Sequence, residues 1–371
     1  MEQEKYGEDG EVGEDGEDGD DGGRVKLPLE IVRYIIRIVA KGLPETWREL
    51  VALSEASGLC HDGDVRRLRE SRGCRESLFA LKGHNNKVTH ALYNKDGTLI
   101  VTASCDLTAR VWDARTGECI QVLRGHSDWI AYASFNMKGN LIVTASFDNT
   151  ACVWSVETGE CLMVLQGHHR PVSSALFSHD GTRIMTSSRD KTVRVWNTQT
   201  NECEQILQGH DSSVRSTLFS PDDSLIVTAS YDETVRVWNA ATGDCLHVLK
   251  GHTGSVFFAS CSPDGARIAT ASNDGMARIW NMHTGECMNV LKGHDAGIFS
   301  ISFSPDGTQI VTTSRDGTTR FWSAASGQER HSLCHQQPGR SVCYDSNNTH
   351  IVIVLEEKIP FVLAAPMFRF K

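Results

Sequence analysis

The pattern of apolar and polar positions after Gly83 predicts four short strands joined by tight turns. Residues Val88 to Tyr93 form the first expected strand. Leu99 to Ser104 form the second, which is almost entirely apolar or small, as is typical of a strand buried on both faces. A third strand ends at Trp112, and a fourth, outer strand covers Cys119 to Leu123. The segments between them are rich in turn formers, so we expect an antiparallel meander.

This unit recurs five more times at a step of 42 residues, with four residue types kept in phase. The His that follows a Gly occurs as His84, His126, His168, His210, His252 and His294. The Ser occurs as Ser104, Ser146, Ser188, Ser230, Ser272 and Ser314, and the Asp as Asp106, Asp148, Asp190, Asp232, Asp274 and Asp316. The closing Trp occurs as Trp112, Trp154, Trp196, Trp238, Trp280 and Trp322. A unit that opens with Gly-His, closes with Trp and repeats at a fixed period of 40 to 45 residues is the signature of propeller blades.

On these residues the chain resembles the WD-repeat family over roughly residues 75 to 363. The resemblance implies an all-β fold, a seven-bladed propeller with six regular blades and one degenerate blade. It also implies that the His, Ser, Asp and Trp of each unit form a buried hydrogen-bonded chain within their blade. Removing one member would leave buried groups unpaired, at a cost of about 1–3 kcal/mol each.

The seventh unit is predicted from a weaker match after Trp322. A shift of 41 residues aligns His335 with His294, and places Leu355, Glu357 and Leu363 where the repeats have Ser, Asp and Trp. This unit supplies three strands.

The fourth strand of the seventh blade is available upstream at Ser77 to Leu81, so the ring would close by pairing the two ends of the chain. Pro360 counts against this closure, because it falls within an expected inner strand, where a missing N–H donor is poorly tolerated.

Residues 24–74 have a helical pattern instead. Pro28 suits a first helical position, and apolar residues from Leu29 to Val39 recur on one face. The opening of this segment resembles an F-box, a helical module that docks substrate receptors onto cullin ubiquitin ligases. The alternative is a helical cap on the propeller.

The charge of the chain is concentrated at its start. Residues 1–22 hold eleven acidic residues and one Lys, which equals the formal net charge of -10. We therefore expect residues 1–23 to be a disordered acidic tail and residues 364–371 to be a C-terminal tail. The remainder is neutral, so the sequence predicts no electrostatic footprint for nucleic acid.

The twelve cysteines do not indicate a secreted protein, because the N-terminus lacks a signal pattern. Five of them follow the 42-residue step and would lie on different blades, too far apart to pair with one another. No Cys-x-x-Cys occurs and no apolar run is long enough to span a bilayer. We expect a cytoplasmic or nuclear protein with no metal, cofactor or membrane partner.

Ser, His and Asp are also the residue types of a catalytic triad. Because Ser, His and Asp recur together in all six repeats, we interpret them as structural residues and not as a catalytic triad. The set Ser178, His179 and Asp180 occupies a turn position where other repeats have Ser-Pro-Asp, and we interpret it as turn chemistry.

The family resemblance implies that partners bind a narrow top opening, at positions three and five beyond the His and at the position before the Asp. Aromatic and arginine side chains are frequent there, as in binding hot spots. The predicted partner-binding residues are Lys87, Trp129, Phe147, Arg189, Arg215, Tyr231, Phe257, Phe299 and Arg315. This set suits proteins or peptides with acidic or phosphorylated segments.

Three functions follow from these observations. The first is a non-enzymatic interaction scaffold. The second is a substrate receptor of a cullin ligase, which the F-box-like helices or Trp112-Asp113-x-Arg115 would dock, since this motif resembles one that binds a ligase adaptor. The third is an enzyme, for which the sequence contains no set of catalytic residues outside the repeat phase and the turns.

Overall fold

The computed structural model describes residues 79–335, 337–356 and 360–364, and only the backbone of Phe79, Phe361 and Ala364. The acidic tail predicted over residues 1–23, the helical module predicted over residues 24–74 and the end of the chain after residue 364 lie outside the described residues.

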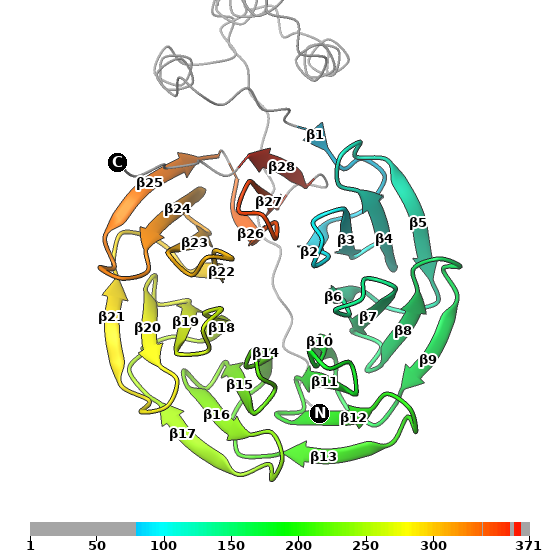
Figure 1. The fold of residues 1–371 in the computed structure, drawn as a ribbon, viewed down its shortest axis with the longest axis horizontal. Helices are drawn as coiled ribbons and strands as arrows, with labels where there is room; N and C mark the ends of the chain where they lie inside the picture. The colour runs from blue at the N-terminus through cyan, green and yellow to red at the C-terminus, as the bar shows by residue number, and fades with distance from the viewer. Residues whose placement is uncertain (1–78, 336, 357–359, 365–371) are drawn as a thin grey trace, which may run out of the picture. The chain divides into compact units, whose positions relative to one another are not determined.

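The described strands form seven four-stranded antiparallel sheets, arranged as blades around a common axis (Figure 1). The prediction of an all-β, seven-bladed propeller is therefore confirmed. Each regular blade follows chain order from the axis outwards, as the hairpin-rich sequence predicts.

The strand bounds of the first three blades are β2 (Val88–Tyr93), β3 (Leu99–Ser104), β4 (Thr108–Asp113) and β5 (Cys119–Arg124); β6 (Ile130–Phe135), β7 (Leu141–Ser146), β8 (Ala151–Ser155) and β9 (Cys161–Leu165); and β10 (Val172–Phe177), β11 (Arg183–Ser188), β12 (Val193–Asn197) and β13 (Cys203–Leu207). Those of blades 4 to 6 are β14 (Val214–Phe219), β15 (Leu225–Ser230), β16 (Val235–Asn239) and β17 (Cys245–Leu249); β18 (Val256–Cys261), β19 (Arg267–Ser272), β20 (Ala277–Asn281) and β21 (Cys287–Leu291); and β22 (Ile298–Phe303), β23 (Gln309–Ser314), β24 (Thr318–Ser323) and β25 (Glu329–Cys334). Blade 7 contains β26 (Gly339–Tyr344), β27 (His350–Leu355), β28 (Phe361–Ala364) and β1 (Phe79–Ala80).

Blade 7 joins the two ends of the propeller. Strand β1 pairs with β28, with Phe79 opposite Val362 and Ala80 opposite Phe361. Pro360 does not interrupt this blade, because β28 begins one residue later and the Pro360 carbonyl accepts a hydrogen bond from the Leu81 N–H at 3.1 Å. The concern that Pro360 lies inside an inner strand was wrong: it precedes the strand. β28 also runs to Ala364, one residue past the predicted boundary.

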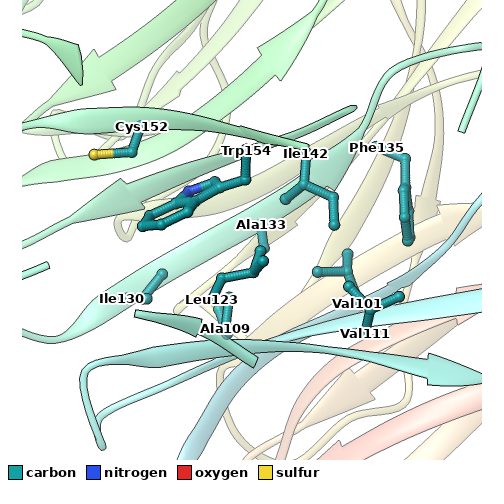
Figure 2. Packing of buried hydrophobic residues seen from close by; sticks show 11 residues of the cluster. Val101, Ala109, Val111, Leu123, Ile130, Ala133, Phe135, Ile142, Cys152 and Trp154 are labelled. Atoms are coloured by element: carbon teal, nitrogen blue, oxygen red, sulfur yellow. The ribbon is translucent and has the colours of Figure 1, made fainter. Parts of the chain in front are cut away.

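The hydrophobic core lies between neighbouring blades. Val101 and Val111 of blade 1 pack in one cluster with Ile142, Phe135 and Trp154 of blade 2 (Figure 2). Equivalent clusters join the following blades, so each blade buries its apolar faces only against its neighbours. The ring must close for the first and last blades to be covered on both sides.

Three inner strands bring aromatic rings into contact across the axis. His90 of β2 stacks on Tyr132 of β6 with 3.9 Å between ring centroids. Phe258 of β18, on the far side of the ring in Figure 1, lies 6.3 and 6.4 Å from them. Burial lowers the pKa of His90 to about 3.

Candidate functional site

Each regular blade contains a chain of side-chain hydrogen bonds from its Trp to its Asp. In blade 1, the Trp112 Nε1–H donates to the Thr102 hydroxyl at 2.8 Å. Thr102 in turn contacts His84 Nε2 at 2.7 Å, and His84 Nδ1 lies 2.8 Å from Asp106 Oδ2. Because the carboxylate only accepts, His84 Nδ1 is the donor to Asp106, and each of these polar side-chain atoms has a partner.

The threonine at the centre of this chain was not among the residues singled out from the sequence. Its series follows the same 42-residue step and is completely buried: Thr102, Thr144, Thr186, Thr228, Thr270 and Thr312. The signal was present, since this residue is in phase with the His and the Trp. It was missed because a Thr inside an apolar strand looks like ordinary strand composition.

The serine of each unit does not contact the histidine. Ser104 Oγ donates to the Lys87 carbonyl at 3.0 Å and accepts the Asp106 N–H at 3.0 Å. Both His84 nitrogens are already occupied by Thr102 and Asp106. A Ser–His pair of the catalytic kind requires a hydrogen bond between the two side chains, so this set serves to hold the turn instead.

The aspartates of the chain accept several hydrogen bonds. Burial by itself would raise the pKa of Asp274, but hydrogen bonds from His252 and from the backbone of Met276 and Thr253 outweigh it and lower the pKa to about 2. The same balance lowers the pKa of Asp106, where burial is opposed by His84 and Thr108. These carboxylates are charged at neutral pH and fix their loops.

A backbone hydrogen bond holds two of the three variable positions side by side in every blade. In blade 2, the Phe147 N–H donates to the Trp129 carbonyl at 2.8 Å, and in blade 3 the Arg189 N–H donates to the Pro171 carbonyl at 2.9 Å. The bond recurs in the other five blades, including Glu356 to Pro338 in blade 7. Since the bond uses main-chain atoms only, the scaffold leaves these side chains free to vary.

The first aromatic–arginine cluster consists of Trp129, Phe147 and Arg189, from blades 2 and 3. The rings of Trp129 and Phe147 lie 5.8 Å apart, and the Arg189 guanidinium lies 4.5 Å from the Phe147 ring centre. Trp129 is 48% exposed, more than any other aromatic side chain among the large apolar residues at the described surface. An exposed Trp held by a neighbouring ring and a cation is typical of a binding hot spot.

The second aromatic–arginine cluster consists of Tyr231, Phe257, Phe299 and Arg340, from blades 4 to 7. Tyr231 meets Phe257 edge-on at 5.7 Å, and Phe257 stacks on Phe299 at 5.2 Å. The Arg340 guanidinium lies 5.2 Å from the Phe299 ring centre. This continuous contact spans blade boundaries, so the predicted residues Tyr231, Phe257 and Phe299 from three separate repeats lie in one cluster.

The remaining predicted partner-binding residues are the charged side chains Lys87, Arg215 and Arg315. Glu356 forms ion pairs with Arg340 at 2.5 Å and with Lys87 at 3.6 Å. Arg215 is half-buried and donates to the Ser173 carbonyl at 3.3 Å, whereas Arg315 is exposed.

Arg340 and Glu356 were not among the predicted partner-binding residues, although they occupy positions that the family resemblance assigns to partner binding. Arg340 is five residues beyond His335, and Glu356 precedes Glu357, the residue aligned with the repeat Asp. They were missed because the rule was applied to the six regular repeats only.

The Asp113–Arg115 pair forms part of an outer turn. Asp113 Oδ1 accepts the N–H groups of Arg115 and Thr116 at 2.8 and 2.7 Å. Asn197 caps the equivalent turn of blade 3 in the same way. The Asp is thus explained by turn chemistry, and Arg115 is exposed.

Ser178, His179 and Asp180 likewise form turn contacts and do not form a triad with one another. Ser178 Oγ donates to Asp180 at 2.6 Å, while His179 Nδ1 pairs with Asp223 of the next blade at 2.7 Å. His179 therefore links two blades and does not contact Ser178 as a base would.

Among the residues that the structure describes, no group of three His, Cys, Asp or Glu side chains could hold a metal ion. No helix in that part of the chain could cross a membrane.

Comparison with known proteins gives two results. The family model described as "WD domain, G-beta repeat" matches six segments, residues 75–113, 117–155, 159–197, 201–239, 243–281 and 285–323, which together cover more than half of the chain. Ribosome assembly protein 4 of Chaetomium thermophilum is 46% identical over 41 residues, which is 11% of this chain and 8% of that protein. The similarity to this relative thus spans about one repeat and a small part of its length.

Proposed function

The chain belongs to the WD-repeat family, and we propose that it is a non-enzymatic interaction scaffold that holds partner proteins at the top opening of its propeller. The family as a whole supports a protein-binding role. The match to Ribosome assembly protein 4 covers too little of either chain to suggest a partner.

The observation that carries this proposal is the pair of aromatic–arginine clusters. Their residues occupy the variable positions of otherwise matched repeats. For Trp129, Phe147, Arg189 and Tyr231, a main-chain hydrogen bond fixes the backbone whatever the side chain. Stability therefore does not explain why Trp, Phe, Tyr and Arg gather here. Aromatic and arginine side chains dominate the energetics of protein interfaces.

The charges favour a partner segment that combines an apolar anchor with an acidic or phosphorylated group. Arg340 is paired with Glu356, but no carboxylate among the described residues pairs with the guanidinium of Arg189, Arg215 or Arg315. A guanidinium can bind a carboxylate or a phosphate through two parallel hydrogen bonds. Trp129, beside Arg189 in the first cluster, would receive the apolar anchor.

The test is the double variant Trp129→Ala/Arg189→Ala in the full chain. We expect it to lose the main partners in a proximity-labelling or pull-down comparison with the wild type. Both side chains project from the scaffold, so the melting temperature should change little.

The matched control is Glu160→Ala. This exposed residue lies in the outer turn between β8 and β9 of the blade that carries Trp129, away from the clusters. We expect this variant to keep the wild-type partner list. If the folded double variant also keeps that list, the binding-face proposal is wrong.

A substrate receptor of a cullin ligase is the second candidate function. Exposure of the Arg115 guanidinium on an outer turn is the structural observation that favours it. Pull-down with and without residues 1–74, probed for cullin-ligase subunits, separates the two functions. A scaffold without ligase activity would capture none of these subunits in either form.

A further inference from the structure

Blade 2 departs from the other regular blades at one buried position. In five of the six, the residue two before the repeat Trp is an arginine: Arg110, Arg194, Arg236, Arg278 and Arg320. In blade 2 this residue is Cys152, which is 5% exposed and lies beside Trp154 in Figure 2.

The arginine of the other blades reaches the first residue of the outer strand. In blades 1, 3, 4 and 5 that residue is a cysteine, and the guanidinium Nη1 lies 3.8–3.9 Å from its sulfur. In blade 6 it is Glu329, which lies 2.6 Å from Arg320. The guanidinium thus fills the space between the third and fourth strands.

In blade 2 a pocket of about 370 Å³ opens at this place, lined by Cys152, Cys161, His126, Asp148 and Trp154, among others. Cys161 begins β9 and is exposed, while Cys152 is buried on β8. Two cysteines therefore line this pocket, where every other regular blade has one thiol or none. Solvent reaches the outer thiol directly.

We propose that Cys152 and Cys161 form a thiol-oxidation site that hydroperoxides convert to a reversible disulfide. The Cys161 thiolate attacks the peroxide, which breaks the O–O bond, gives Cys161 sulfenic acid and releases water or an alcohol. The Cys152 sulfur then attacks the sulfenic sulfur, the S–S bond forms, and the Cys152 proton leaves with the sulfenic oxygen as water. The two thiols lose two electrons and the peroxide gains them.

The strand register makes the bond reachable. Cys161 lies opposite Trp154, two residues beyond Cys152, while Cys152 itself lies opposite Val164, and the register shifts between Val153 and Trp154. Across this irregularity Cys152 and Cys161 line the same pocket, and a disulfide needs their Cα atoms within about 7 Å. β9 can make this approach because it is the outer strand of its blade, with a hydrogen-bonded neighbour on one side only.

The electrostatics assign the two roles. Burial, together with the neighbouring Cys161, raises the pKa of the Cys152 thiol, so Cys152 stays protonated and unreactive on its own. The exposed Cys161 is the sulfur that peroxide meets first. Cys152 then becomes the resolving thiol, because it lines the same pocket as Cys161. Its sulfur also lies 4.0 Å from His126 Nδ1, which pairs with Asp148 at 2.7 Å.

The test exposes the folded full-length chain to hydrogen peroxide and maps its peptides without reduction. We expect a Cys152–Cys161 cross-linked peptide in the wild type that disappears on addition of dithiothreitol. Cys152→Arg restores the residue found in the other regular blades and should fold normally. It should lose the cross-link and accumulate Cys161 sulfenic acid, which dimedone traps.

The reciprocal variant Arg194→Cys transfers the pair to blade 3, where the Arg194 guanidinium lies 3.9 Å from the Cys203 sulfur. We expect a second cross-linked peptide in this variant, with the blade 2 cross-link retained. If the wild type forms no Cys152–Cys161 cross-link at peroxide levels that oxidise Cys119 or Cys203, the proposal is wrong. A cross-link at these levels that dithiothreitol cannot reverse would equally overturn it.

Discussion

Replacing Thr228 by Val tests whether the buried hydrogen-bonded chain stabilises the propeller. Thr228 is completely buried, with its hydroxyl 2.9 Å from Trp238 Nε1 and 2.7 Å from His210 Nε2. Valine keeps the β-branched shape and the strand propensity but has no hydroxyl. The substitution therefore leaves one buried donor and one buried acceptor without partners.

The expected loss follows from those two groups. Each buried polar atom without a partner costs about 1–3 kcal/mol, so Thr228→Val should destabilise the protein by about 2–6 kcal/mol. Little of this loss comes from a cavity, because the side chain keeps its volume. If Trp238→Phe is added, the unpaired N–H disappears, and the double variant should lose less than the sum of the single variants.

The assay is urea unfolding, monitored by tryptophan fluorescence and by circular dichroism. Midpoints are compared between variants whose unfolding curves have equal m-values. The control is Thr253→Val at an exposed loop position, expected to change the free energy of unfolding by no more than about 0.5 kcal/mol. Equal midpoints for Thr228→Val and Thr253→Val would refute the stabilising role of the chain.

Three further predictions concern the core, the closure and the acid limit. Trp238→Ala should destabilise by about 3–5 kcal/mol, the usual range for emptying a buried aromatic site, and denaturant unfolding measures it. Deleting residues 358–371 removes β28 and leaves β1 unpaired, so it should lower the melting temperature far more than deleting residues 1–22; equal melts would argue against closure through β28. The folded pKa of Asp274, about 2, lies below its ordinary value of 3.8, so its stabilisation is complete above pH 4 and is lost as the pH falls towards 2. Asp274→Asn should flatten the loss of stability in that window, and an unchanged acid unfolding profile would contradict the assignment.

The repeat period predicted the architecture because each blade depends on local spacing. Gly-His, Ser-Asp and Trp fixed the strands and their order, and even the degenerate blade was recovered from His335 and Leu363. What the period could not supply was the partner of each polar group. Thr102 joins the Trp to the His, a link that depends on which atoms meet across two strands.

The sequence predicts which positions carry the candidate binding residues, but not which of these side chains contact one another. The repeat numbering selected Phe147 and Arg189, yet their contact crosses a blade boundary and depends on how neighbouring blades pack. Arg340 required the same numbering in the degenerate blade. The F-box-like or capping role of residues 24–74 stays a prediction, because these residues lie outside the described part of the chain.

Pairing of β1 with β28 in blade 7 also determines when the ring can close during synthesis. β1 is among the first described strands to leave the ribosome and β28 the last, with about 280 residues made in between, which at 5–20 residues per second takes on the order of 15–60 seconds. Blades 1 to 6 can form in order during this interval. Leu81 and the side of blade 1 that packs against blade 7 stay exposed until blade 7 is made. A nascent chain that stalls before residue 360 therefore shows an unpaired strand and an open apolar face, a state that chaperones and proteases can tell apart from the finished ring.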